Sequence, residues 1–156
     1  MKSLAEFQAL LRQRTWDKEV LLWLGSEKSI VGALGSTNHI ILDLLDLFDN
    51  DHLPADEEDT KNVLREGLKR RLREIPRGSD KRTVLIVTSI GLIARCHVGL
   101  KEFYDWFVGS HTLVVLVLGN LPENRSWPEE VHCDTKRLTG YFAESGMVKD
   151  VYGANA

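Results

Sequence analysis

Two runs of consecutive apolar residues in the second half of the chain predict buried β-strands. Thr83–Thr88 and Thr112–Leu118 are apolar at almost every position, not only at every second one. Strands of this kind are buried on both faces, which is typical of a parallel sheet covered by helices. Between the two runs, large apolar side chains recur at helical spacing over 100–108. This stretch therefore predicts an α/β fold built around a strand–helix–strand unit.

Weaker apolar patterns predict the remaining elements. The run 19–24 predicts a first buried strand, and 39–48 predicts a strand that continues as a short helix. Leucines at helical spacing predict a long amphipathic helix from about Asp59 to Ile75, with Leu64, Leu68, Leu72 and Ile75 on its buried side. We expect a connection at 32–38, where small and polar residues interrupt the pattern. Residues 91–94 are expected to continue from the preceding strand, and 95–99 to form a turn before the next helix.

These elements predict one domain, α/β in class, with three layers and a mostly parallel sheet covered by helices on both faces. An amphipathic helix within 1–14 opens the domain, 19–120 forms its core, and 121–152 adds a helix at about 134–145 and an edge strand at 147–152. At 156 residues and 43% apolar composition, the chain is long enough to bury a core without disulfides or metals.

Charge and cysteine content narrow the classes of protein. A net charge of −3 argues against a generally basic nucleic-acid binder. Two cysteines are too few for a disulfide framework, which favours a reducing cytoplasm. No apolar stretch reaches the roughly 18 residues that a membrane span needs. We therefore expect a cytoplasmic protein with no membrane association.

The first strand leads into a segment that partly matches a phosphate-binding loop. The full motif is a glycine, four residues and then Gly-Lys-Ser/Thr, whose backbone amides surround the phosphates. Here only Gly25 and the pair Lys28-Ser29 are present, and Glu27 stands where the second glycine would be. One interpretation is an ordinary strand-to-helix turn with Ser26 as N-cap. The other is a shortened loop that contacts phosphate. The first is favoured, because a glutamate repels polyphosphate.

The end of the central strand also lacks a catalytic group. P-loop hydrolases need an acidic residue there to hold the Mg²⁺ shell. In this chain the strand ends in Thr88-Ser89, whose hydroxyls contact phosphate or water but carry no charge. We therefore do not expect an ATPase of the usual kind, and the non-enzymatic interpretation is favoured over an enzymatic one.

The long helix and the loop after it carry the densest positive charge in the chain. One interpretation is a solvated helix face whose cations suit its C-terminal end. The other is a surface that binds a nucleic-acid backbone or an acidic partner. The candidate binding residues are Arg65, Lys69, Arg70, Arg73, Arg77, Lys81 and Arg82.

Two groups of potential metal ligands have the wrong spacing for a site. The aspartates at 43, 46, 49 and 51 lack the glycine and terminal glutamate of a calcium loop, so we expect a solvated acidic loop. The pairs Cys96-His97 and His132-Cys133 are adjacent residues, and no CxxC spacing accompanies them. No metal site is expected.

The order strand, Lys-Ser helix, strand, helix, apolar strand, helix, apolar strand resembles the RecA/AAA-like P-loop core over residues 19–120. With its short length and compact C-terminal segment, the chain is similar to the small P-loop-like accessory proteins of bacterial BREX phage-defence clusters. This resemblance implies Lys28 and Ser29 as positions that contact phosphate and magnesium, and places Thr88 at the acidic position without its charge. No cofactor is expected, and Mg-ATP is the alternative that the resemblance implies.

Three functions follow from these observations. The leading one is a non-catalytic, P-loop-like accessory or scaffold protein of a bacterial defence or DNA-processing complex. Its partner would be a larger ATPase or DNA-modifying enzyme, with DNA as a further ligand of the basic helix. The alternative is a nucleotide-binding sensor or atypical ATPase that uses the shortened loop. The third is a receiver-like regulator with Asp43 as its acidic site, although Lys101 is poorly placed as its lysine.

Overall fold

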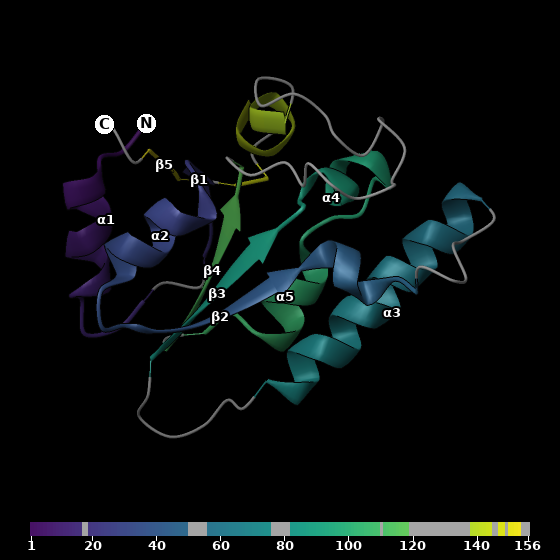
Figure 1. Ribbon diagram of the computed structural model, residues 1–156, viewed down its shortest axis with the longest axis horizontal. Coiled ribbons are helices and arrows are strands. Elements are labelled where there is room, and N and C mark those ends of the chain that lie inside the picture. Colours follow the sequence, from purple (N-terminus) through teal and green to yellow (C-terminus); the bar gives the residue numbers. More distant parts are fainter. Residues whose placement is uncertain are drawn as a thin grey trace.

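The described part of the chain forms a five-stranded, all-parallel sheet in the order β2-β3-β4-β1-β5 (Figure 1). This computed structural model describes residues 1–16, 19–49, 56–75, 82–109, 111–118, 138–144, 147–148 and 150–153. The strands are β1 (Val20–Leu24), β2 (Asn38–Asp43), β3 (Thr83–Thr88), β4 (Thr112–Val117) and β5 (Val151–Gly153). The predicted α/β class and parallel sheet are therefore confirmed.

Helices cover both faces of this sheet (Figure 1). On one face lie α1 (Leu4–Leu11) and α2 (Glu27–Leu34), which contribute Phe7 and Ile30 to one apolar cluster. The other face carries η1 (Leu44–Leu47), α3 (Glu57–Glu74), α4 (Gly91–Arg95), α5 (Lys101–Trp106) and η3 (Gly140–Glu144), whose apolar side chains form a second cluster.

The surroundings of the central strand β3 explain why its sequence is continuously apolar. Val84 and Ile86 belong to the cluster on the α1/α2 face, whereas Leu85 and Val87 belong to the cluster on the α3/α5 face. All four side chains have 0% exposure. Successive side chains of a strand point to opposite faces, so a strand covered on both sides has no position left for a polar residue.

Helix α3 is anchored by the predicted leucine stripe. Leu64, Leu68 and Leu72 are all 0% exposed. Asp56 caps the helix by accepting a hydrogen bond from the amide of Asp59 at 2.8 Å, so the helix begins at Glu57 instead of Asp59. Gly67 lies against η1: a Cβ at this position would be only 3.2 Å from Leu47 Cβ. The small residue lets α3 approach η1 closely.

Three local expectations are wrong. A connection was expected from Gly32 onward, but helix α2 continues to Leu34. Gly32 lies on the exposed side of the helix with open space around it, so no packing contact ends the helix there. Residues 91–94, expected to continue from the strand, instead belong to the short helix α4, whose Leu92 and Ile93 are fully buried. Asp43 belongs to no solvated acidic loop. It is the last residue of β2 and is only partly exposed, since it accepts hydrogen bonds from Ser89 and from the amide of Leu45.

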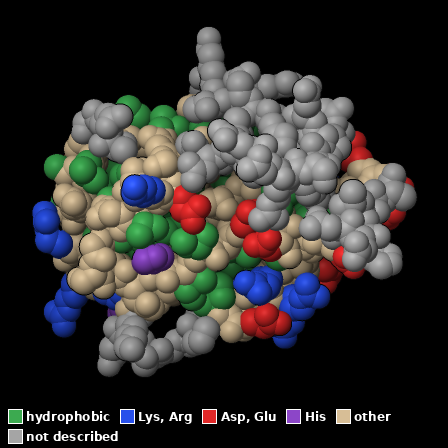
Figure 2. Space-filling model, in the orientation of Figure 1, with side chains coloured by type: hydrophobic (Ala, Val, Ile, Leu, Met, Phe, Trp, Pro, Cys, Tyr) green, Lys and Arg blue, Asp and Glu red, His purple; other side chains and the backbone are tan. Residues whose placement is uncertain are grey.

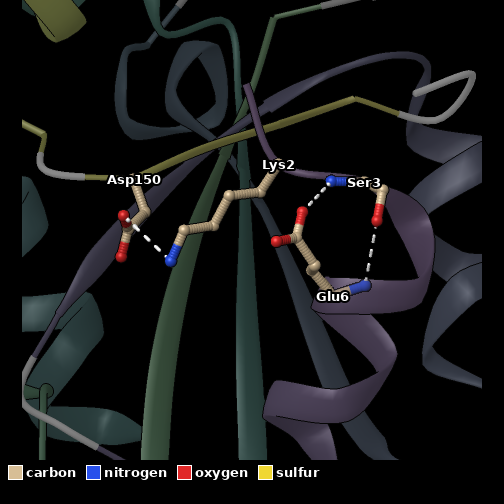
Figure 3. Close-up of polar contacts among 4 residues, drawn as sticks. All are labelled: Lys2, Ser3, Glu6 and Asp150. Atoms are coloured by element: carbon tan, nitrogen blue, oxygen red, sulfur yellow. Dashed lines mark hydrogen bonds and ion pairs between the residues drawn. The ribbon is translucent and has the colours of Figure 1, made fainter.

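The start of the chain closes the sheet beside β5 (Figure 3). The amide of Lys2 donates to the Val151 carbonyl at 2.7 Å, and the Gly153 amide donates to the Lys2 carbonyl at 3.1 Å. The Lys2 ammonium lies 3.3 Å from Asp150, and this hydrogen bond raises the pKa of Lys2. Next to it, Ser3 and Glu6 form a reciprocal capping box that starts α1.

Candidate functional site

The segment with phosphate-loop resemblance folds as a capped strand-to-helix turn. Ser26 has extended backbone angles, and its hydroxyl accepts a hydrogen bond from the amide of Ser29 at 3.0 Å. Its carbonyl accepts the first backbone bond of α2, from Ile30 at 3.2 Å. These are the contacts of an ordinary helix N-cap. At the start of α2, the backbone amide of Ser29 therefore donates to Ser26 and not to a bound phosphate.

The hydroxyl of Ser29 is directed into the protein. It accepts a hydrogen bond from the indole nitrogen of Trp23 at 2.9 Å and donates one to the Ser26 carbonyl at 2.7 Å. A hydroxyl has one proton to donate, so the Ser29 proton is already committed. Trp23 itself has 0% exposure. Mg²⁺ binds an oxygen lone pair, and Trp23 already uses one of the two on Ser29, so a metal at Ser29 would have to use the remaining one. The Lys28 side chain is exposed to solvent.

Replacing Ser29 with alanine is expected to destabilise the protein in the absence of any nucleotide. The substitution leaves the indole N–H of Trp23 without its acceptor, and an unsatisfied buried donor costs about 1–3 kcal/mol. Urea denaturation measures the loss. The matched control is Lys28→Ala, an exposed neighbour, whose unfolding free energy should stay within about 0.5 kcal/mol of wild type. Equal stability of Ser29→Ala and wild type would show that the hydroxyl has no structural role.

The turn nevertheless lies where open α/β sheets bind ligands. The chain leaving β1 enters α2 on one face, whereas η3, the next described helix after β4, lies on the other face. Since β1 and β4 are neighbours, their carboxyl ends form a topological switch point. Ligands of such sheets bind in the crevice outside this point. Gly25–Ser29 follows the end of β1 directly.

Thr88 also lies at the carboxyl end of the sheet, but on β3, two strands away from β1. β4 separates β3 from β1, so the carboxyl ends of β3 and β1 are roughly 10 Å apart at the spacing of paired strands, and Lys28 follows β1 in the first turn of α2. Thr88 is 6% exposed, and in the sheet register it pairs with Asp43. Ser89 follows with a left-handed backbone angle, φ 60°, and donates to the Asp43 carboxylate at 2.6 Å. Asp43 thus holds β2, β3 and η1 together.

The exposed surface of α3 gathers four of the predicted binding residues. Arg65, Lys69, Arg70 and Arg73 recur at helical spacing and lie away from the buried leucine stripe. Figure 2 shows basic and acidic side chains side by side over this helix. We call this set, with Trp106 of α5, the α3 surface. Arg77 and Lys81 lie outside the described residues.

Trp106 orders two of these cations. The ammonium of Lys69 lies 5.5 Å from the centroid of its ring and the guanidinium of Arg73 lies 5.0 Å from it. Cation–π contacts of this kind are worth about 0.5–1 kcal/mol each at exposed sites. Lys69 and Arg73 are one helical turn apart, so a single ring from α5 holds both. The sequence analysis missed Trp106, although a tryptophan among charged residues of a short amphipathic helix is a usable signal.

A shallow hollow of about 280 Å³ lies on the α3 surface. Its lining combines the cations Lys69, Arg70 and Arg73 with the carboxylates of Glu66 and Glu74. This mixture carries one net positive charge. A surface of mixed sign suits a protein segment with acidic residues better than a continuous phosphate backbone.

Arg82 does not join the α3 surface. Its guanidinium lies 4.2 Å from the ring centroid of Trp16 and donates to the Leu11 carbonyl. Trp16 is 2% exposed and belongs to the cluster on the opposite face of the sheet from α3. Arg82 Nε is buried and meets no acceptor among the residues that the structure describes. The arginine therefore ties the segment after α1 to the start of β3.

Among the described residues, no group of three or more His, Cys, Asp or Glu side chains converges as metal ligands do. Cys96 is buried at 2% exposure, whereas its neighbour His97 is exposed, so their side chains lie in different environments. No described helix combines the length and the apolar character that crossing a membrane requires.

Comparison of the sequence with known proteins gives no relative from which a role can be transferred. No protein-family model matches the chain, and no curated protein matches it. The assignment of function therefore rests on the geometry of the two regions described above.

Proposed function

We propose that the protein is a non-catalytic, P-loop-like accessory or scaffold domain that works by binding an acidic segment of a larger protein through the α3 surface. The observation that carries this proposal is the arrangement of Lys69 and Arg73 over Trp106 on an exposed helix. Ordering by the ring lowers the entropy that two long side chains lose when a partner binds. Tryptophan and arginine are also the residue types that dominate binding energy at protein interfaces.

The turn after β1 supports the non-catalytic part of the proposal. Ser29 donates to Ser26 and accepts from Trp23, so the hydroxyl expected at magnesium has structural partners instead. Thr88 supplies no negative charge at the end of β3. Neither the metal anchor nor the general base of a nucleotide hydrolase therefore stands at the end of β3, and the carboxylate beside it, Asp43 of β2, accepts hydrogen bonds from Ser89 and Leu45.

The nature of the partner is inferred from charge. Glu66 and Glu74 line the same hollow as the cations, so a uniformly negative phosphate backbone is repelled there, whereas a protein segment can place its acids opposite the cations and neutral or basic residues opposite the glutamates. We therefore favour a protein partner over DNA. The resemblance to accessory proteins of BREX defence clusters suggests a large ATPase or a DNA-modifying enzyme as the protein that carries the acidic segment.

One observation favours a second candidate, a nucleotide-binding sensor. The turn Gly25–Ser29 lies at the switch point between β1 and β4, where sheets of this kind bind ligands. Under this alternative Lys28 contacts phosphate, and Ser29 offers Mg²⁺ the lone pair that Trp23 does not use.

Affinity purification of the tagged full-length protein from cells that express it naturally tests the proposal. We expect a protein partner in stoichiometric amount that stays bound after nuclease digestion and dissociates as salt is raised, because exposed charge pairs are screened. Recovery of nucleic acid alone, with the protein partner lost on nuclease treatment, would instead indicate DNA or RNA binding. Recovery of no partner would contradict the proposal.

A further inference from the structure

The two edges of the sheet differ in how they are protected. β5 is a strand of three residues, and Lys2 pairs with it from outside. β2 has six residues, all paired with β3, and within the described part of the chain no other strand pairs with its outer side. A strand in this position presents a row of backbone N–H and C=O groups that are available to a further strand.

β2 also lacks the features that usually block an edge strand. Its sequence, Asn-His-Ile-Ile-Leu-Asp, contains no lysine, proline or glycine. Its register with β3 is continuous over six pairs, without a bulge. Edge strands are commonly protected by such charges, prolines or bulges. Ile41 in the middle of β2 is 42% exposed, and Figure 2, which faces this edge, shows hydrophobic side chains gathered over β2.

The two faces of β2 have different surroundings. Ile40 and Leu42 pack into the cluster on the α3/α5 face. Since side chains alternate along a strand, His39, Ile41 and Asp43 lie on the α1/α2 face. Ile41 is exposed because it belongs to neither apolar cluster. A further strand that extends the sheet at this edge would bury this apolar side chain.

We propose that β2 pairs with the β2 strand of a second copy of this chain, antiparallel and about a two-fold axis through Ile41, to form one continuous sheet. A two-fold axis perpendicular to the sheet keeps each face on its own side, so residues opposite each other must share a face. Centred on Ile41, this register places Ile41 opposite Ile41 of the second copy. It also places His39 of each copy opposite Asp43 of the other.

The side chains of this register are self-complementary. Ile40 and Leu42 of the two copies lie opposite each other and extend the apolar layer beneath α3 and α5. In this register the imidazole of His39 lies opposite the carboxylate of Asp43, an acceptor that pairs with a ring N–H donor. A register centred on Ile40 would instead place Ile41 opposite His39 and Leu42 opposite Asn38. The register centred on Ile41 is favoured, because it pairs His39 with a carboxylate and apolar side chains with apolar side chains.

Analytical ultracentrifugation of the full-length protein over a concentration series tests this proposal. We expect a dimer in wild type, monomers for Ile41→Lys and for Ile41→Asp, and a heterodimer when the two variants are mixed, because Ile41 meets its own copy. Val63→Lys is the matched control, since Val63 is 38% exposed on α3, and it should dimerise as wild type does. Circular dichroism establishes that each variant is folded.

A second variant tests the register itself. Residues directly opposite in an antiparallel pair have Cα atoms about 4.5–5.5 Å apart, which is within the range of a disulfide. Ile41→Cys in a Cys133→Ser background should form an intermolecular disulfide under mild oxidation, whereas Val63→Cys should not. A wild-type protein that stays monomeric at every concentration would overturn the proposal. So would a dimer that survives Ile41→Lys and Ile41→Asp, or a mixture of these variants that stays monomeric.

Discussion

Replacement of Trp23 with alanine is expected to lower the free energy of unfolding by about 3–5 kcal/mol. Trp23 is completely buried in the middle of β1, and its ring centroid lies 5.1 Å from that of Phe7. Its indole nitrogen bonds Ser29, so it joins β1, α1 and the start of α2. A domain of this size is stable by only about 5–15 kcal/mol, and the variant should therefore unfold at a much lower urea concentration.

Trp106→Ala is the matched control for this variant. It removes the same residue type from a partly exposed position on α5, where only part of the side chain is withdrawn from water. We expect a clearly smaller loss, because burial sets the size of the effect. If the two variants lose equal stability, the cluster between α1, α2 and the sheet does not hold the fold as described.

The double charge reversal Lys69→Glu and Arg73→Glu is expected to weaken capture of the protein partner by about 100-fold or more. Close charge pairs at interfaces couple by about 1.5–7 kcal/mol, and reversal replaces two attractions with repulsion. Surface plasmon resonance with the purified partner measures the change. The fold should persist, because both side chains lie outside the leucine stripe of α3 and lose only their contacts with Trp106.

The control for charge alone is the double variant Arg12→Glu and Arg14→Glu. Both arginines are exposed near the end of α1, on the opposite side of the sheet from α3, and the net charge changes by the same amount. This control should retain wild-type affinity at physiological salt, where distant charges are screened. A similar loss in both double variants would indicate a general electrostatic effect and would contradict a specific α3 surface.

Patterns of neighbouring residues predicted the regular elements well. Thr83–Thr88 agrees with β3 at both ends, because a strand buried on two faces must be apolar throughout. Leu64, Leu68 and Leu72 were correctly placed inward, because helical periodicity is a local property. Short elements were harder: α4 has five residues, and burial of Leu92 and Ile93 stabilises it more than any intrinsic propensity.

The surroundings of the candidate site depend on contacts between residues far apart in the sequence. Arg82 was grouped with the cations of α3 because they are close in sequence, yet its side chain packs on Trp16 across the sheet. Trp106 was not recognised because its position beneath Lys69 and Arg73 arises only when α5 packs against α3. Ser29 was a candidate magnesium contact, and its bond to Trp23 depends on how α2 leaves β1.

Calorimetric titration of the purified protein with Mg-ATP and Mg-ADP tests the central claim, that this is a binding domain without a nucleotide site. We expect no saturable heat up to millimolar nucleotide, for wild type and for Lys28→Ala alike, because the shortened turn carries Glu27 in place of the second glycine and its Ser29 amide donates to Ser26. Tight binding in wild type that Lys28→Ala abolishes would contradict the account. It would establish the turn after β1 as a working, shortened phosphate loop.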